Sequence, residues 1–307
     1  MPTFSLTDNA ADLNPETGIA DPPSPVVLSR QPLPPNQDPF FDPNYFNLTM
    51  ISDIVELKTG ALAKSVQGLR ALDGNDYVKG SADSEFMNGN LGSDCLLGKG
   101  GNDTLRGGKD FDVVSGGIND DILSGNEGDD YLYGNDDNDV LRGGQGNDVL
   151  VGGSGADFLV GDRGVDKLWG FGGIDVFVLT REAGAPPQVI GAASPQIGEP
   201  ESIVQLLPAD IILDYNPQED LIGLNSGLTP NNLVLSERYV TIGDARDYDP
   251  IGPYPLGFAR TEELRYLSTK VTVISEAITG LILGMVNNVS PSELRFASIP
   301  DVALFVG

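Results

Sequence analysis

Residues 98–169 read GKGGNDTLR GGKDFDVVS GGINDDILS GNEGDDYLY GNDDNDVLR GGQGNDVLV GGSGADFLV GDRGVDKLW, which is eight successive nonapeptides without insertion or deletion. The same period extends from Ala71 to Val178 and gives twelve units, whose positions we number from 1 to 9 starting at Ala71. Glycine occupies position 1 in eleven of the twelve units, and aspartate occupies position 6 in eleven, with Glu85 as the exception. Such a period is typical of an architecture in which each unit stacks on its neighbours.

Three positions of the unit predict its local structure. Position 8 is apolar in all twelve units, and positions 7–9 favour β-branched, aromatic and leucine residues. This pattern predicts a three-residue strand in each unit, with position 8 pointing inward. Position 4 is glycine in eight units, and the other four carry Asp83, Asp110, Asn119 and Asp137. Because these residue types tolerate a positive φ, we expect a left-handed turn at position 4.

The array resembles the RTX (haemolysin-type) nonapeptide-repeat calcium-binding family, whose repeat is GGxGxDxUx. The resemblance covers roughly a third of the chain and implies an all-β fold. It implies a right-handed parallel β-roll (an RTX β-solenoid) with two nonapeptides per coil, followed by a β-rich C-terminal capping region. It also implies that Ca²⁺ lies between loop n and loop n+2. Each ion would take carbonyls from positions 1 to 4 of both loops and one position 6 carboxylate from each.

The candidate metal ligands follow from this pattern, because Ca²⁺ takes six to eight hard oxygen ligands, and several ions, up to about ten, are expected. The expected carboxylate ligands are Asp76, Asp94, Asp103, Asp112, Asp121, Asp130, Asp139, Asp148, Asp157, Asp166 and Asp175. The expected carbonyl donors are Gly98, Gly101, Gly107, Gly116, Gly125, Gly128, Gly134, Gly143, Gly146, Gly152, Gly155, Gly161 and Gly164. Weak sites are expected in the first two units, where Leu72, Ser81, Asp83 and Glu85 depart from the motif. The alternative interpretation is that the aspartates only close Asx-turns.

The charge of the chain points to cations as partners. Its 45 acidic residues against 18 basic ones give a net charge of −27, which disfavours association with nucleic acid. Position 6 carboxylates stacked about 4.8 Å apart would repel by about 0.9 kcal/mol per contact in water. About ten such contacts give about 9 kcal/mol, which is comparable with the net stability of a domain. We therefore expect the roll to require a bound cation. The alternative, an acidic disordered linker, does not need an invariant apolar position.

Catalytic signals are weak. The chain has no histidine, which excludes Ser-His-Asp and Cys-His catalysis and histidine-ligated metals. The single cysteine, Cys95, lies inside a repeat and is expected to be a small buried apolar residue. The acidic pairs Asp247 with Asp249 and Glu262 with Glu263 are more often solvated surface than glycosidase carboxylates. We expect a protein that is not an enzyme. The alternative is an exported accessory module, or a variant, of an RTX-type extracellular hydrolase or epimerase.

Four regions are expected along the chain. Residues 1–50 hold 10 of the 22 prolines and predict a disordered tail. Residues 51–70 predict a cap made of a short helix or a first strand, and residues 71–179 predict the calcium-binding roll. Residues 180–307 predict a β-rich cap that contains a candidate secretion segment at residues 292–307.

Local patterns subdivide the C-terminal region. Its strand-like stretches are residues 211–213, 221–224, 232–235, 271–278 and 281–286. Thr279-Gly280 predicts a hairpin turn between the last two of these stretches. Ser290 and Glu293 match a capping box and predict a short C-terminal helix. The last repeats also turn apolar at outward positions, so we expect the C-terminal region to cover the outer face there. The residues concerned are Val149, Val151, Phe158, Val160, Trp169, Val176 and Val178.

The expected location is extracellular or at a bacterial cell surface. The N-terminal stretch lacks a basic segment followed by an apolar one, so we expect no secretory signal peptide. No run of 18 apolar residues occurs, so we expect no transmembrane segment. The family resemblance implies export by a type I secretion machinery that reads an uncleaved C-terminal segment. A surface polysaccharide or another cell-surface protein is a candidate partner besides calcium ions.

Overall fold

The computed structural model describes residues 45–48, 50–62, 68–180, 209–225, 227–242 and 267–299. Its strands form two long sheets, and successive strands of the repeats alternate between the two. The expected disordered tail falls almost entirely outside these residues, as do Asp247, Asp249, Glu262, Glu263 and residues 300–307, the second half of the candidate secretion segment.

Each sheet runs the length of the repeat array. The members of the first sheet, in spatial order, are β1 (Tyr45–Asn47), β3 (Gly68–Asp73), β5 (Phe86–Leu91), β7 (Thr104–Lys109), β9 (Ile122–Glu127), β11 (Val140–Gln145), β13 (Phe158–Arg163), β15 (Val176–Leu179), β17 (Leu221–Leu224) and β21 (Phe296–Ser298). Those of the second are β2 (Ile54–Glu56), β4 (Tyr77–Lys79), β6 (Cys95–Gly100), β8 (Val113–Ile118), β10 (Tyr131–Asp136), β12 (Val149–Ser154), β14 (Lys167–Gly172), β16 (Asp210–Ile212), β20 (Ile282–Asn287), β19 (Leu267–Glu276) and β18 (Leu233–Ile242). The described residues also contain the single-turn 3₁₀ helices η1 (Pro230–Asn232) and η3 (Pro291–Glu293). None of the helices in the described ranges has the length and apolar character to cross a membrane.

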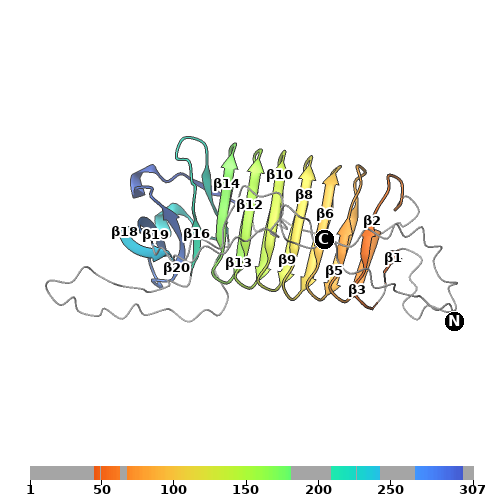
Figure 1. The fold of residues 1–307 in the computed structure, drawn as a ribbon. Coiled ribbons are helices and arrows are strands. Elements are labelled where there is room, and N and C mark those ends of the chain that lie inside the picture. The colour runs from red at the N-terminus through yellow and green to blue at the C-terminus, as the bar shows by residue number, and fades with distance from the viewer. Residues whose placement is uncertain are drawn as a thin grey trace, which may run out of the picture.

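Neighbouring strands within the repeats pair in parallel and are offset by two nonapeptides. Tyr131 of β10 pairs with Val149 of β12, and Val140 of β11 pairs with Phe158 of β13. Two nonapeptides therefore make one coil, and Figure 1 shows the coils stacked in a single row. This region is a parallel β-solenoid, which confirms the fold class predicted from the sequence.

The strands are longer than the three residues predicted. Each strand from β5 to β14 spans six residues. In β10 the pairing covers Tyr131, Leu132 and Tyr133 at positions 7–9, skips the glycine at position 1, and resumes at Asn135 and Asp136. The chain bends at position 1 and then pairs again, so the first part of each loop also belongs to the sheets.

The core of the roll is a single column of position 8 side chains. All twelve side chains are fully buried: Val78, Met87, Leu96, Leu105, Val114, Leu123, Leu132, Leu141, Leu150, Leu159, Leu168 and Phe177. This confirms the predicted inward direction of position 8. Burying one such side chain contributes about 1.5–3 kcal/mol, and the roll obtains it only once per nine residues.

Strands from outside the array extend the stack at its N-terminal end. β2 pairs in parallel with β4, and β1 pairs in parallel with β3. The segment before the array is thus strand rather than helix, with Val55 and Leu69 buried. The strand β1 (Tyr45–Asn47) lies inside the stretch that the proline content predicted to be disordered.

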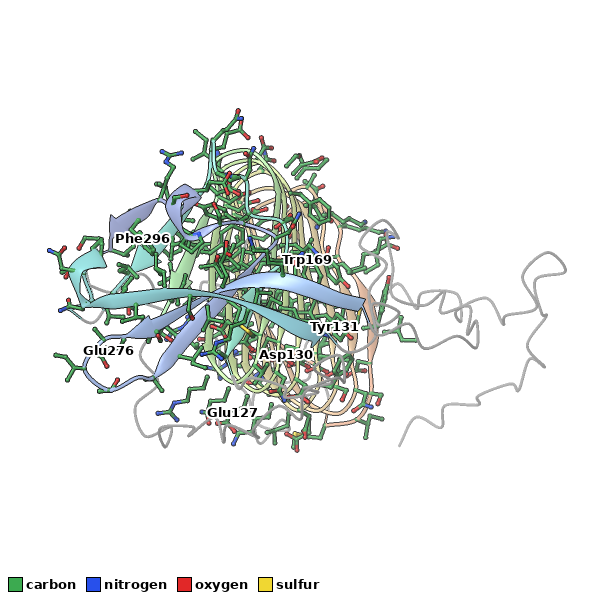
Figure 2. The ribbon with its side chains drawn as sticks, turned by 90° about the vertical axis from the view of Figure 1, so that its left-hand side faces the viewer. Glu127, Asp130, Tyr131, Trp169, Glu276 and Phe296 are labelled. Atoms are coloured by element: carbon green, nitrogen blue, oxygen red, sulfur yellow. The ribbon has the colours of Figure 1, made fainter. Side chains whose placement is uncertain are left out.

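The C-terminal region continues the same two sheets. β16 and β17 pair in parallel with β14 and β15, and β20 and β21 add the next strands. β19 pairs antiparallel with both β18 and β20, and Figure 2 shows these strands lying across the near end of the stack. The predicted hairpin between β19 and β20 is present, with Gly280 at φ 72°. The predicted C-terminal helix is only the single 3₁₀ turn η3, where Ser290 N donates to Glu293 Oε2 at 3.0 Å.

The outward apolar residues of the last repeats are mostly withdrawn from solvent. Val151, Val160 and Val178 are buried. The side chains of Ile299, Val176 and Val178 all lie close to the α-carbon of Gly223. Cys95 differs from expectation, because it begins β6 at an outward position and is half-buried rather than buried.

Removing the C-terminal strands should weaken the roll. A chain ending at Leu179 would lack β16, β17 and β20, so the edges of β14 and β15 would be unpaired and Leu168 and Phe177 would contact water. Losing the burial of each such side chain costs about 1.5–3 kcal/mol, and a repeat array frays from an uncovered end. We expect the shortened chain to need more Ca²⁺ to reach half-maximal folding, measured by circular dichroism. Equal midpoints for the two chains would contradict this role of the C-terminal strands.

Candidate metal centre

The position 6 carboxylates form two rows, one along each edge of the roll where the chain passes between the sheets. The first row contains Asp76, Asp94, Asp112, Asp130, Asp148 and Asp166. The second row contains Glu85, Asp103, Asp121, Asp139, Asp157 and Asp175. Each of these eleven aspartates is at most 2% exposed. The structure thus brings together, coil by coil, the carboxylates that the sequence predicted as ligands; Asp130 is labelled in Figure 2.

In both rows, the carboxylate oxygen Oδ1 of an aspartate accepts a hydrogen bond from the neighbouring coil. The backbone N–H of Asp94 donates to Asp112 Oδ1 at 2.8 Å, and that of Asp112 donates to Asp130 Oδ1 at 2.8 Å. The second row repeats the contact, for example from Asp121 N to Asp139 Oδ1 at 2.8 Å. A hydrogen bond to a charged acceptor contributes about 1.5–3 kcal/mol, so Oδ1 is a substantial link between coils.

The other carboxylate oxygen, Oδ2, is buried and accepts no hydrogen bond in ten of these aspartates. They are Asp76, Asp94, Asp103, Asp112, Asp121, Asp130, Asp139, Asp148, Asp157 and Asp175. An ionised carboxylate oxygen held away from water without a partner is strongly unfavourable. A repeated atom of this kind, on both edges of the roll, fits a positively charged ligand and does not fit an Asx-turn, which would satisfy the carboxylate.

Glycine is required at position 1 because Oδ2 lies against it. A Cβ atom at Gly134 would overlap Asp139 Oδ2 and would also contact the carbonyl oxygen of Gly152 in the next coil. Gly143 has the same two neighbours, Asp148 Oδ2 and the carbonyl oxygen of Gly161. Two oxygens from adjacent coils therefore converge beside each of these glycines.

Two positions of each loop adopt a left-handed backbone. Position 4 has a positive φ in eleven units, as predicted, including at Asp110, Asn119 and Asp137; the prediction is wrong for Asp83 in the second unit. Position 2 also has a positive φ in every unit except the second, which the sequence did not reveal. The sequence pattern did not predict this because position 2 includes Leu72, Lys99 and Phe171, residue types that rarely adopt a positive φ. In most proteins such strain is held in place by the surrounding structure, often at a functional site.

Burial raises the pKa of the row carboxyls. Burial raises the pKa of Asp112, Asp139 and Asp148 to about 8; the backbone N–H of the preceding coil opposes this shift, and the charges of neighbouring aspartates add to it. Burial likewise raises the pKa of Asp130 and Asp157 to about 6. Without a cation, the carboxyls with a pKa of about 8 resist ionisation at neutral pH.

The donor set fits calcium. It consists of carboxylate and main-chain carbonyl oxygens, and no three acidic, cysteine or histidine side chains of the described residues converge into one metal-sized cluster. An ion here would therefore take most of its ligands from carbonyls, with the carboxylates supplying charge. Ca²⁺ accepts six to eight such oxygens in flexible geometry, whereas Mg²⁺ demands near-octahedral geometry and dehydrates reluctantly, and Zn²⁺ prefers nitrogen and sulfur.

Comparison with known families agrees with this chemistry. Residues 69–95, 97–132, 115–150, 133–168 and 151–178 match the family model of the RTX calcium-binding nonapeptide repeat. No curated protein matches the chain. The repeat array is therefore an RTX calcium-binding array, and calcium binding is the property for which this family of repeats is named.

Both rows extend beyond the array through residues that the sequence pattern missed. Asp166 N donates to Asp210 Oδ1 at 3.2 Å, and Asp175 N donates to Asp220 Oδ1 at 3.1 Å. At the other end, Asp53 N donates to Asp76 Oδ1 at 2.6 Å. Asp210 and Asp220 each precede a fully buried apolar residue by two positions, as position 6 precedes position 8. This two-residue spacing could have identified Asp210 and Asp220 from the sequence, but both residues lie outside the nine-residue period of the array.

A third row, at position 5, was also missed. Asp129 Oδ1 accepts the N–H of Asn147 at 2.7 Å, and Asn147 Oδ1 accepts the N–H of Val165 at 3.1 Å. In these exposed bonds the N–H of the later coil donates to a side chain of the earlier coil, which is the reverse of the position 6 bonds. Neighbouring loops are thus held by side chains in both directions.

Replacing one buried row carboxylate should weaken calcium binding more than replacing an exposed one. Asp130→Asn keeps the size of the side chain but removes the charge of Oδ2, so we expect the calcium midpoint of folding to rise several-fold. Asp136→Asn is the control, because Asp136 is exposed and bonds only the Ser154 hydroxyl at 2.9 Å. Asp76→Asn, at the start of the first row, should have an intermediate effect. Equal midpoints for Asp130→Asn and Asp136→Asn would contradict the ligand assignment.

Acid should stabilise the calcium-free roll. The folded-state pKa of Asp112, Asp139 and Asp148 is raised to about 8 from an ordinary value of 3.8, so the folded chain binds more protons than the unfolded chain between these values. The stability of the metal-free roll should therefore fall as pH rises from about 4 to about 8. We expect more β-structure by circular dichroism at pH 5.5 than at pH 8 in calcium-free buffer. A calcium-free spectrum that is more β-rich at pH 8 would refute the burial of these carboxyls.

Proposed function

We propose that the chain is a secreted or cell-surface calcium-binding protein whose roll folds when it binds Ca²⁺ outside the cell. The observation that supports this most directly is the series of ten buried aspartate Oδ2 atoms without a hydrogen bond, nine of which lie beside a position 1 glycine. The proposed ligands are these carboxylates with Asp166 and the carbonyls of the position 1 to 4 residues, for several ions, up to about ten.

The proposed coupling of folding to export follows from calcium concentration. Extracellular calcium modules typically bind at about 10⁻⁴–10⁻³ M, far above the calcium concentration that cytosolic sites are tuned to. Residues 71–178 hold 21 acidic and 7 basic residues, a net charge of −14, so the calcium-free chain is self-repelling. A chain that stays unfolded inside and folds outside suits a type I secretion machinery, which we propose as its export route. A bacterial cell-surface polysaccharide or protein is the proposed partner there.

We propose a binding role rather than catalysis. The chain has no histidine. The buried carboxylates of the described residues are those of the two rows, their continuations Asp210 and Asp220, and Glu276, which accepts the Thr279 hydroxyl at 2.6 Å. Calcium here would hold coils together. The alternative is that the chain is an accessory module, or a variant, of an extracellular hydrolase or epimerase. The same roll would then be part of a larger assembly.

Calcium titration tests this function. We expect β-structure to appear cooperatively as Ca²⁺ is raised through about 10⁻⁴–10⁻³ M, because the ions offset the repulsion and occupy the unsatisfied oxygens. Mg²⁺ at the same concentrations should not produce the change. The measurement is far-ultraviolet circular dichroism, followed by addition of EDTA to test reversal. A β-rich spectrum that EDTA leaves unchanged would exclude calcium-driven folding.

A further inference from the structure

The loop of the second unit, residues 80–85, is closed by its own side chains. Ser81 N donates to both carboxylate oxygens of Glu85, at 3.2 Å to Oε1 and 3.3 Å to Oε2, and the Ser81 hydroxyl donates to Oε1. Glu85 is 6% exposed, so this is a buried carboxylate with local donors. The ten row aspartates with an unbonded Oδ2 have no such donors for that oxygen.

The backbone of this loop also differs from the others. Ser81 and Asp83, at positions 2 and 4, are the two residues at these positions that lack the positive φ found in the other eleven units. Asp83 instead accepts the backbone N–H of Gly60, and its own N–H donates to the Ser81 hydroxyl at 3.1 Å. Each departure from the repeat motif in this unit therefore makes a hydrogen bond that the regular motif does not make.

The Glu85 carboxylate lies beside Gly80, in the place that the position 6 aspartate carboxylate takes in the regular units. A Cβ atom at Gly80 would come within 2.9 Å of Glu85 Oε2 and would also contact the carbonyl oxygen of Gly98. These are the same two kinds of oxygen that flank Gly134 and Gly143 in the regular units. Here, however, an N–H and a hydroxyl point at the carboxylate, and their positive ends disfavour a cation at that point.

The other end of the same row uses a similar closure. Asp220 Oδ2 accepts the N–H of Asn216 at 2.7 Å, a donor four residues earlier, as Ser81 is four residues before Glu85. Asp220 is the last carboxylate of this row in the described residues, and no further loop of the array follows it.

From these contacts we infer that Glu85 with Ser81, and Asp220 with Asn216, are metal-free closures that end the calcium row at both its ends. The first calcium site of the second row then lies between loops 98–103 and 116–121, where Asp103 Oδ2 is unbonded and adjoins Gly98 beside the carbonyl of Gly116. Ser81 and Glu85 thus fix how many ions this row holds. The inference rests on the proposed calcium-binding function.

Restoring the regular motif tests the inference. The variant Ser81→Gly/Asp83→Gly/Glu85→Asp gives this unit the pattern of its neighbours, and we expect it to bind one more Ca²⁺ per chain than the natural protein. The measurement is the calcium content of the full-length protein after equilibrium dialysis at saturating calcium, by plasma emission spectrometry.

The reverse transfer covers the case in which the restored variant fails to fold. Asn135→Ser/Asp139→Glu gives the eighth unit the same residues as the second unit at positions 2, 4 and 6, because Asp137 already stands at position 4. We expect this double variant to bind at least one Ca²⁺ fewer than the natural protein.

Three outcomes separate the inferences. A natural protein that binds no calcium would defeat the proposed function itself. Calcium binding by the natural protein, with full calcium content in the double variant, would overturn the closure while leaving the function intact. A crystal structure grown in calcium with an ion on Glu85 would overturn it as well.

Discussion

The two oxygens of the position 6 carboxylate have opposite effects on the roll. Oδ1 accepts an N–H from the preceding coil, as between Asp94 and Asp112, and so ties each coil to the next. Oδ2 of the same residues is buried against a position 1 glycine without a hydrogen bond. Burying an anion without a partner costs free energy, so Oδ2 opposes the coil stacking that Oδ1 favours unless a cation binds to Oδ2. The proposed function therefore makes coil stacking and calcium binding one equilibrium, as in other sites that form only on folding.

The remaining features of the repeat serve this arrangement. Glycine stands at position 1 because a side chain there would overlap Oδ2, and left-handed residues at positions 2 and 4 shape the turn whose carbonyls face the carboxylates. The core contains one large apolar residue per nine, and glycine loses much conformational freedom on folding. A solenoid with so thin a core depends on interactions in its loops. Calcium, the position 6 bonds and the position 5 bonds supply them.

The period of the sequence was enough to predict much of this structure. Position 8 predicted the core from Val78 to Phe177, and position 4 predicted the turns, because each reflects a local requirement that recurs in every unit. The left-handed position 2 was hidden, because Lys99 and Phe171 adopt it under the constraint of neighbouring coils rather than by their own preference. Asp210 and Asp220 were hidden because long insertions separate them from their row partners. Only the three-dimensional stacking shows that they continue it.

The ends of the roll pose a problem that its interior does not. An interior loop can share ions with a loop on each side, whereas an end loop has a neighbour on one side only, so its carboxylate must be satisfied in another way. Asp220 uses Asn216 N, and Asp214 covers the N–H groups of Gly170 and Phe171 at 3.0 and 2.8 Å. These contacts need no metal. In a linear array, where folding propagates between neighbours, an end that is already satisfied lowers the cost of forming the adjacent coil. The C-terminal strands therefore both cover the last coil and offer a calcium-independent surface on which the first ion-bound coil can form.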